Sequence, residues 1–209
     1  MGGDEITEFS SRYPDRVDKL VYLEGGYDWS DTAFFKPFAD ILAINSPEPA
    51  VLNSLDTLRS WYSAAWIGKG IAWTDGLEAF LCDATRIKPD GAIDPVPSLD
   101  VFTALLQTLG TWSRDYTKVR APALALYATN FFPTDRSDPV LAEKLRAFEE
   151  GAMDPFRRAS MERIHRELAI VTVRQIDDRT HMSIGVVELD VLAELNREFL
   201  LAPARPDSK

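Results

Sequence analysis

The chain has 209 residues, of which 33 are acidic and 23 are basic, so its net charge is −10 with both histidines neutral. A surface that binds phosphate groups needs clustered Lys and Arg, so this charge argues against a nucleic-acid partner and against an anionic membrane surface. A hydrophobic share of 45% and a charged share of 27% are typical of a globular domain with a buried core. The longest apolar runs, such as residues 121–128, are far shorter than the about 20 residues of a membrane-spanning helix.

Cysteine and histidine are scarce in this sequence. Cys82 is the one cysteine, which excludes an internal disulfide, and we expect it to be an ordinary buried thiol. One cysteine and two histidines are also too few for a structural zinc site, so we expect no bound metal. The N-terminus lacks the charged start and apolar core of a signal peptide, which predicts a cytoplasmic location if this N-terminus is the natural one.

The predicted elements begin with a helix over residues 1–13. Pro14 ends this helix, because proline cannot continue its hydrogen-bond ladder. A strand follows over residues 17–23, and the continuous apolar run at residues 20–23 indicates that both of its faces are buried. Glycines end the strand, at positions 25 and 26.

The next predicted unit is a helical insertion over residues 27–116. Short helical patterns alternate there with prolines, and the segment carries every tryptophan of the chain. These are Trp29, Trp61, Trp66, Trp73 and Trp112. Aromatic side chains form large apolar surfaces, so they can line a hydrophobic pocket or pack the insertion onto the rest of the protein.

Buried strands and helices alternate in the remainder of the chain. A strand is predicted over residues 119–129 and a loop over residues 130–139, and a charged helical stretch then extends to about residue 168. Residues 171–176 are rich in β-branched side chains and predict a third strand. A loop at residues 177–183 and an amphipathic helix at residues 184–200 complete the pattern. Strands that alternate with helices predict a parallel α/β sheet.

Two segments near the N-terminus carry a family resemblance. Met1-Gly2-Gly3-Asp4-Glu5, followed by the run from Tyr13-Pro14-Asp15-Arg16-Val17 to Glu24, resembles the segment after the nucleophile elbow of the α/β-hydrolases. In that family a strand ends in G-x-S-x-G, often G-H-S-M-G-G, and the next helix leads to a strand of the pattern YP-x-R-V-x-x-L-V-x-L. The resemblance implies that the nucleophilic serine directly precedes Met1, and that the backbone N–H of Met1 is an oxyanion donor.

His181 follows the third predicted strand within Asp177-Asp178-Arg179-Thr180-His181. This segment is similar to the catalytic-histidine loop of the α/β-hydrolases, which implies that His181 is the general base. Imidazole suits that role because it can accept and return a proton near neutral pH. The other histidine, His165, lies between arginines in a charged helix, where we expect a solvated face.

The acid of the catalytic triad has several candidates. The family usually places it after the penultimate strand in a pattern such as Y-G-x-x-D, but this chain has Tyr127-Ala128-Thr129-Asn130-Phe131 there. Asp135, further along the same loop, is the first choice for the acid, and Asp138 is the second choice. Glu24, at the end of the first visible strand, is the alternative, because some members of the family take their acid from that position.

The resemblance implies part of an α/β-hydrolase fold, with the last three parallel strands, flanking helices and a helical cap insertion. We expect the core to comprise residues 1–26 and 117–202. The cap would comprise residues 27–116, and residues 203–209 would form a flexible tail.

The implied function is serine hydrolysis of a small apolar ester or a related substrate, without a cofactor. Esterases, epoxide hydrolases, dehalogenases and C–C hydrolases share the fold, so the leaving group stays open. Because the chain as given lacks the nucleophile, we expect it to be inactive alone, whether through a misplaced start codon, a fragment or a truncated gene. The alternative is a non-catalytic remnant that serves as a binding or structural module. An unpaired strand edge at residues 20–23 predicts self-association.

Overall fold

The structure is a computed structural model that describes residues 2–186 and 189–203. Three expectations fall on other residues and lie outside this range. They concern Met1 as an oxyanion donor, the part of the last helix at residues 187–188, and the tail from residue 204 to residue 209.

The helices are α1 (Gly2–Arg12), α2 (Thr32–Ile44), α3 (Leu55–Tyr62), α4 (Asp75–Asp83), α5 (Leu99–Leu109), α6 (Pro139–Phe148), α7 (Asp154–Glu167) and α8 (Leu189–Leu201). The strands are β1 (Leu20–Leu23), β2 (Thr85–Ile87), β3 (Ile93–Pro95), β4 (Ala123–Asn130) and β5 (Val171–Thr180). Short helical turns are η1 (Pro14–Arg16), η2 (Pro49–Asn53), η3 (Ser63–Ile67), η4 (Tyr116–Lys118) and η5 (Glu149–Met153). Within the described ranges, the helices are too short or too polar to cross a bilayer.

Three parallel strands form the main sheet, in the order β1–β4–β5. Leu23 pairs with Leu126, and Ala128 pairs with Ile176. The central strand, β4, is buried over its first six residues because its apolar side chains enter the core on both faces. The three strands and their parallel direction are therefore confirmed. Among the described residues, β1 is an edge strand.

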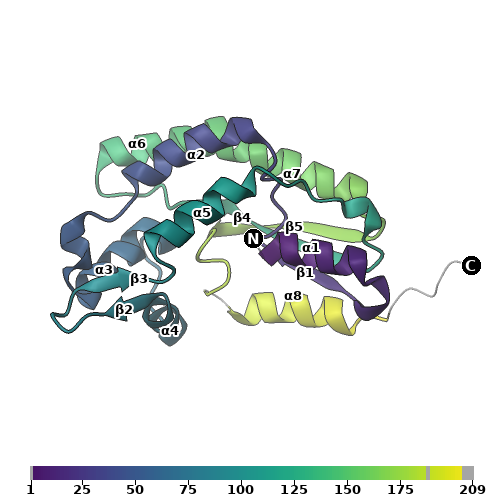
Figure 1. Ribbon diagram of the computed structural model, residues 1–209, viewed down its shortest axis with the longest axis horizontal. Coiled ribbons are helices and arrows are strands. Elements are labelled where there is room, and N and C mark those ends of the chain that lie inside the picture. Colours follow the sequence, from purple (N-terminus) through teal and green to yellow (C-terminus); the bar gives the residue numbers. More distant parts are fainter. Residues whose placement is uncertain (1, 187–188, 204–209) are drawn as a thin grey trace, which may run out of the picture.

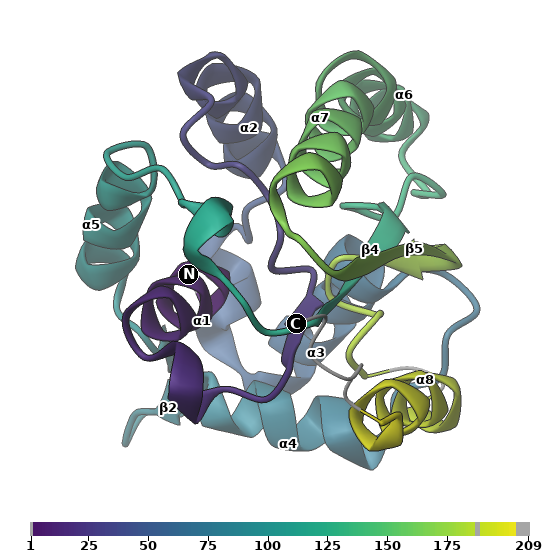
Figure 2. The same cartoon turned by 90° about the vertical axis from the view of Figure 1, so that its right-hand side faces the viewer.

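Helices cover both faces of this sheet (Figures 1 and 2). On one face Tyr22 and Ala125 belong to the same core cluster as Phe156 of α7. On the other face Leu126 packs in a smaller cluster with Leu192 of α8. This arrangement of layers is that of a mixed α/β protein, as the alternating pattern predicts.

The segment between β1 and β4 is not entirely helical, and that part of the expectation is wrong. It contains α2 to α5 and an antiparallel hairpin in which Ile87 of β2 pairs with Ile93 of β3. The hairpin turns at Gly91, whose φ of +87° suits glycine because it has no Cβ. The sequence Pro89-Asp90-Gly91 is a recognisable turn signal. On the adjacent α4, Cys82 is exposed rather than buried.

The third strand is longer than its sequence indicates. Ala128 pairs with Ile176 and Asn130 pairs with Thr180, so residues 177–179 form an irregularity within β5 instead of a loop. Asp178 adopts a φ of +55° there. In a bulge of this kind, polar residues interrupt the alternation of apolar and polar side chains while the strand continues to pair with its neighbour. The sequence pattern therefore did not indicate that β5 extends to Thr180.

The helices of the C-terminal half also differ in detail from the expected ones. The stretch up to residue 168 is divided into α6 and α7 by the π-helical turn η5. The last helix begins in the structure at Leu189, and residues 181–186 form turns. His165 lies on the exposed face of α7, as expected.

Candidate active site

Glu24 directly follows β1 and occupies an unusual backbone conformation. Its φ is +50°, in the left-handed region, where a non-glycine residue costs about 1 kcal/mol. Its backbone N–H donates to the carbonyl of Leu126 at 2.9 Å, so the main chain is still joined to β4. The side chain is only 4% exposed. Such strain at the end of a strand is a common feature of functional positions.

The buried carboxylate of Glu24 accepts hydrogen bonds from three directions. The backbone N–H of Ala128 donates to Oε1. The hydroxyl of Tyr27 lies 3.0 Å from Oε2, and Nδ1 of His181 lies 2.8 Å from the same oxygen. Burial, followed by the nearby charge of Glu24, raises the pKa of Tyr27 well above its ordinary value, so this hydroxyl keeps its proton and donates. The carboxylate is thus satisfied without solvent.

His181 is held on one side by Glu24 and on another by Phe131. Its backbone N–H donates to the carbonyl of Phe131 at 3.3 Å. The imidazole and phenyl rings are stacked with centroids 4.4 Å apart and an angle of 12° between their planes. An ionised carboxylate can only accept, so it favours a proton on Nδ1 and leaves the lone pair on Nε2. Among the described residues Nε2 has no hydrogen-bond partner, and the His181 side chain is 29% exposed.

The structure does not bring the other two candidate acids to the imidazole. Asp135 is exposed, and the carboxylate that contacts the imidazole of His181 belongs to Glu24. Asp138 caps the N-terminus of α6, where its side chain accepts from the backbone of Val140 and Leu141. Glu24, the alternative, is thus the candidate acid that contacts His181, whereas the loop after β4 turns Asp135, the first choice on sequence grounds, outward.

A second buried carboxylate, which the sequence did not single out, lies behind the loop after β4. Oε1 of Glu149 accepts from the backbone N–H groups of Phe131 at 2.6 Å and Phe132 at 2.9 Å. Its other oxygen lies 3.2 Å from Nη2 of Arg157. Burial raises the pKa of Glu149, although these donors and Arg157 oppose that change. No sequence signal separates Glu149 from the exposed Glu150 beside it.

The beginning of α1 packs against the turn that follows β1. A Cβ on Gly3 would lie 1.9 Å from the carbonyl oxygen of Gly25, so only glycine fits at position 3. The buried Arg114 joins the two segments, because it donates to that carbonyl oxygen and to the side chain of Asp4. The start of α1 therefore lies at the same end of the sheet as Glu24 (Figure 1).

The insertion contacts the loops at this end of the sheet. The hydroxyl of Thr180, at the end of β5, donates to the carbonyl of Trp66 at 2.7 Å. Arg136, in the loop after β4, donates to the side chain of Asn45 at 3.0 Å. In Figure 1 the elements α3, α4, β2 and β3 accordingly lie to the left, beyond the ends of β4 and β5.

The tryptophans of the insertion are mostly packing residues in the structure. Trp29 and Trp66 pack against the main core, and Trp61 and Trp73 pack against a smaller core formed by the insertion itself. Trp112 is exposed. Packing therefore accounts for four of these side chains.

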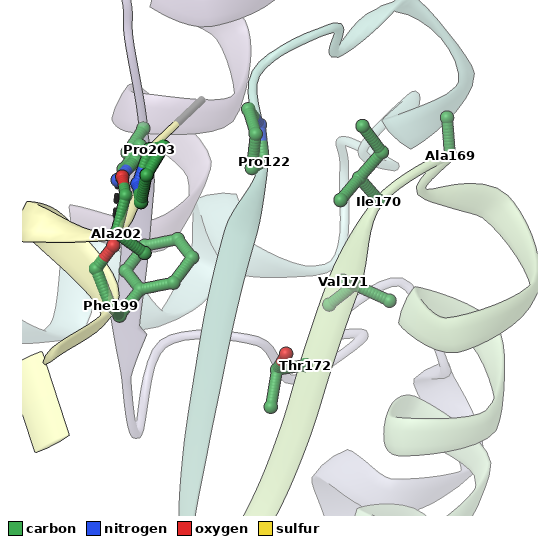
Figure 3. A pocket seen from close by; sticks show the side chains of 9 residues that line it. Pro122, Ala169, Ile170, Val171, Thr172, Phe199, Ala202 and Pro203 are labelled. Atoms are coloured by element: carbon green, nitrogen blue, oxygen red, sulfur yellow. Dashed lines mark hydrogen bonds between the residues drawn. The ribbon is translucent and has the colours of Figure 1, made fainter. Parts of the chain in front are cut away.

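A cavity of about 310 Å³ lies at the opposite end of the sheet (Figure 3). Its lining includes Pro122 and Val171, at the amino ends of β4 and β5, together with Phe199 of α8. Lys19, also in the lining, donates to carbonyl groups at the C-terminus of α8, including that of Phe199 at 2.7 Å. Open α/β sheets bind ligands at the carboxyl ends of their strands, so this cavity is not the candidate site. Within residues 2–186 and 189–203, no three metal-ligating side chains cluster.

A parallel sheet with helices on both faces, and an acid that meets a histidine beyond the ends of the strands, are features of the α/β-hydrolase fold. Comparison with solved structures shows the same fold. An esterase from a marine microorganism is 17% identical, covers 94% of this chain and 66% of its own, and gives a TM-score of 0.53. The E-2-(acetamidomethylene)succinate hydrolase is 13% identical, covers 95% and 63%, and gives 0.60. Carboxylesterase CesB from Bacillus subtilis is 12% identical, covers 97% and 58%, and gives 0.52.

This chain therefore has part of the α/β-hydrolase fold and spans 58–66% of the length of these solved structures. Comparisons with protein-family models and with curated proteins gave no match.

Proposed function

We propose that this chain supplies the acid and the base of a serine hydrolase that acts on esters or related acyl compounds. One observation carries the proposal: the buried Glu24 carboxylate lies 2.8 Å from Nδ1 of His181 while Nε2 has no partner among the described residues. An acid that fixes one imidazole nitrogen prepares the other to accept a proton. Glu24 takes the role of the orienting acid, and His181 that of the general base.

In the proposed reaction, Nε2 of His181 removes the proton of a serine hydroxyl as its oxygen attacks the carbonyl carbon of the substrate. The imidazolium that forms is stabilised by the carboxylate of Glu24. It then gives the proton to the leaving alkoxide, and the acyl group remains on the serine. A water molecule repeats the sequence: it loses its proton to Nε2, attacks the acyl carbon and releases the carboxylic acid and the free serine.

The nucleophile in this proposal is the residue that precedes Met1, in the motif that Met1 and Gly2 would complete. The packing of Gly3 against the carbonyl of Gly25 supports it, because the elbow must bring the start of α1 close to the acid at the end of β1. Ser10 and Ser11 lie inside or at the end of α1 and do not have the geometry of an elbow. Met1, as an oxyanion donor, stays part of the proposal.

The proposed substrate is a small apolar ester, and residues 27–116 are proposed to form its cap. The contact between Thr180 and the carbonyl of Trp66 supports this location, since it joins the insertion to the segment that carries His181. Two of the solved structures with the same fold are named as esterases, which favours ester hydrolysis over the other reactions of this fold. The core would then comprise residues 1–26 and 117–202.

The test begins with the nucleotide sequence upstream of Met1. We expect an in-frame continuation that encodes G-x-S, and we expect the protein made from that longer frame to hydrolyse p-nitrophenyl acetate. His181→Ala and Glu24→Ala should each lower kcat/KM by about 10³-fold or more. His165→Ala, at the exposed histidine of α7, is the matched control and should leave the rate unchanged. An early stop codon, or turnover that survives His181→Ala, would contradict the proposal and favour a non-catalytic binding or structural module.

A further inference from the structure

Phe131 occupies the position where the pattern of the family usually has its acid, yet it still contacts the candidate base. Its ring is stacked on the imidazole of His181 at a centroid distance of 4.4 Å, with 12° between the ring planes. Its carbonyl also accepts the backbone N–H of His181. Phe131 therefore touches both the main chain and the side chain of this histidine.

The Phe131 ring cannot turn freely in its surroundings. It is buried, and Phe38 and Phe132 meet it edge-on at centroid distances of 5.4 Å and 4.9 Å. Trp66 of the insertion lies 6.3 Å away in a similar orientation. A ring that is packed on several sides provides a fixed plane against which the imidazole rests.

The main chain of Phe131 is fixed as well, by the carboxylate of Glu149. The backbone N–H groups of Phe131 and Phe132 donate to the same oxygen, Oε1, at 2.6 Å and 2.9 Å. Arg157, itself buried, balances the charge on the other oxygen at 3.2 Å. An ionic group is costly to bury, so its location directly behind this loop indicates that the loop conformation matters.

We propose that Phe131 is a positioning residue for His181 and that Glu149 holds Phe131 in place. The stacked ring keeps the imidazole plane in the orientation in which Nδ1 faces Glu24, which leaves Nε2 directed away from the acid. The catalytic meaning of this orientation rests on the proposed function. The orientation itself does not, because the location of the imidazole proton can be measured without any turnover.

The tautomer of His181 can be measured by long-range ¹H–¹⁵N NMR spectra of the 209-residue chain, at a pH where the imidazole is neutral. The exposed His165 gives an internal reference in the same spectrum. In the parent we expect the Nδ1–H tautomer at His181. Phe131→Leu should lower the ratio of Nδ1–H to Nε2–H by about two- to tenfold, since the energy of an aromatic pair corresponds to that range. Phe131→Tyr keeps the ring and should restore the ratio of the parent.

Phe34→Leu is the matched control, because Phe34 is also buried but stacks on Phe156 at a centroid distance of 3.9 Å and has no ring contact with Phe131 or His181 among the described residues. It should destabilise the fold to a similar extent and leave the tautomer ratio unchanged. If Phe131→Leu does not fold, Phe131→Met, which keeps more volume, is measured in its place. If Phe131→Leu or Phe131→Met folds and keeps the tautomer ratio of the parent, the inference is overturned, and an equal change of the ratio in Phe34→Leu would overturn it as well. Inactivity of the longer protein would overturn only the proposed function.

Discussion

Glu24 and His181 are separated by 157 positions in the chain, yet Oε2 of the one lies 2.8 Å from Nδ1 of the other. The contact forms because β1 and β5 are parallel and flank the same central strand, so that the residues after them emerge at one end of the sheet. The strained backbone of Glu24 then orients its carboxylate toward β4, where the backbone N–H of Ala128 donates to it. The acid–histidine pair is thus a consequence of sheet topology.

Replacement of Glu24 by Gln should reverse the tautomer of His181. The amide oxygen of Gln is needed by the backbone N–H of Ala128, so the NH₂ group would face Nδ1 and require it to accept. Nε2 would then carry the proton and could no longer act as a base. We expect the Nε2–H form to dominate in ¹⁵N spectra of Glu24→Gln. Persistence of the Nδ1–H form would show that Glu24 does not select the tautomer.

Gly3→Ala should lower the free energy of unfolding by about 3 kcal/mol, because the added Cβ would lie 1.9 Å from the backbone oxygen of Gly25. Gly2→Ala is the matched control, since a Cβ at position 2 meets nothing within 4 Å and should raise stability by up to about 1 kcal/mol. Urea unfolding of both variants measures the difference. Equal stabilities would contradict the close packing of α1 against the turn after β1.

Glu149 should make the stability of the fold depend on pH. Burial raises the pKa of Glu149 above its ordinary value of 4.5, so the folded protein binds this proton more tightly than the unfolded chain does. Its contribution is therefore fully present below pH 4.5 and is lost as the pH rises through the folded-state pKa. Glu149→Gln should flatten the pH dependence of the free energy of unfolding in that window. Glu150→Gln, at the exposed neighbour, should keep the dependence of the parent.

The β1 edge should cause the 209-residue chain to associate with itself, because β1 is an edge strand among the described residues and Leu23 at its end is 40% exposed. Size-exclusion chromatography with light scattering should show dimers or larger species. Leu23→Lys should reduce them, whereas Val140→Lys, at a side chain of α6 that is 62% exposed, should not. A monodisperse, cooperatively melting parent monomer would refute this expectation.

The local pattern of apolar and polar residues correctly predicted the three strands of the main sheet and most of the helices. The continuous apolar run of β4 shows in the sequence because both faces of this central strand are buried. The same pattern in β1 wrongly predicted two buried faces, since Leu20 and Tyr22 are buried but Leu23, on the other face of this edge strand, is exposed. The β2–β3 hairpin was missed although Pro89-Asp90-Gly91 marks its turn, since the prolines around it suggested broken helices. The extension of β5 to Thr180 could not be read, because a bulge removes the alternation that identifies a strand.

The sequence by itself determined the α/β class, the strand order along the chain and the placement of His181 directly after the last strand region. It also named Glu24 among the acids, but it favoured Asp135 because that residue lies nearer the usual position in the chain. Only the tertiary structure shows which of these carboxylates lies beside Nδ1, since that contact forms across the sheet. The roles proposed for Phe131 and Glu149 also rest on contacts between distant segments, which a single sequence does not reveal.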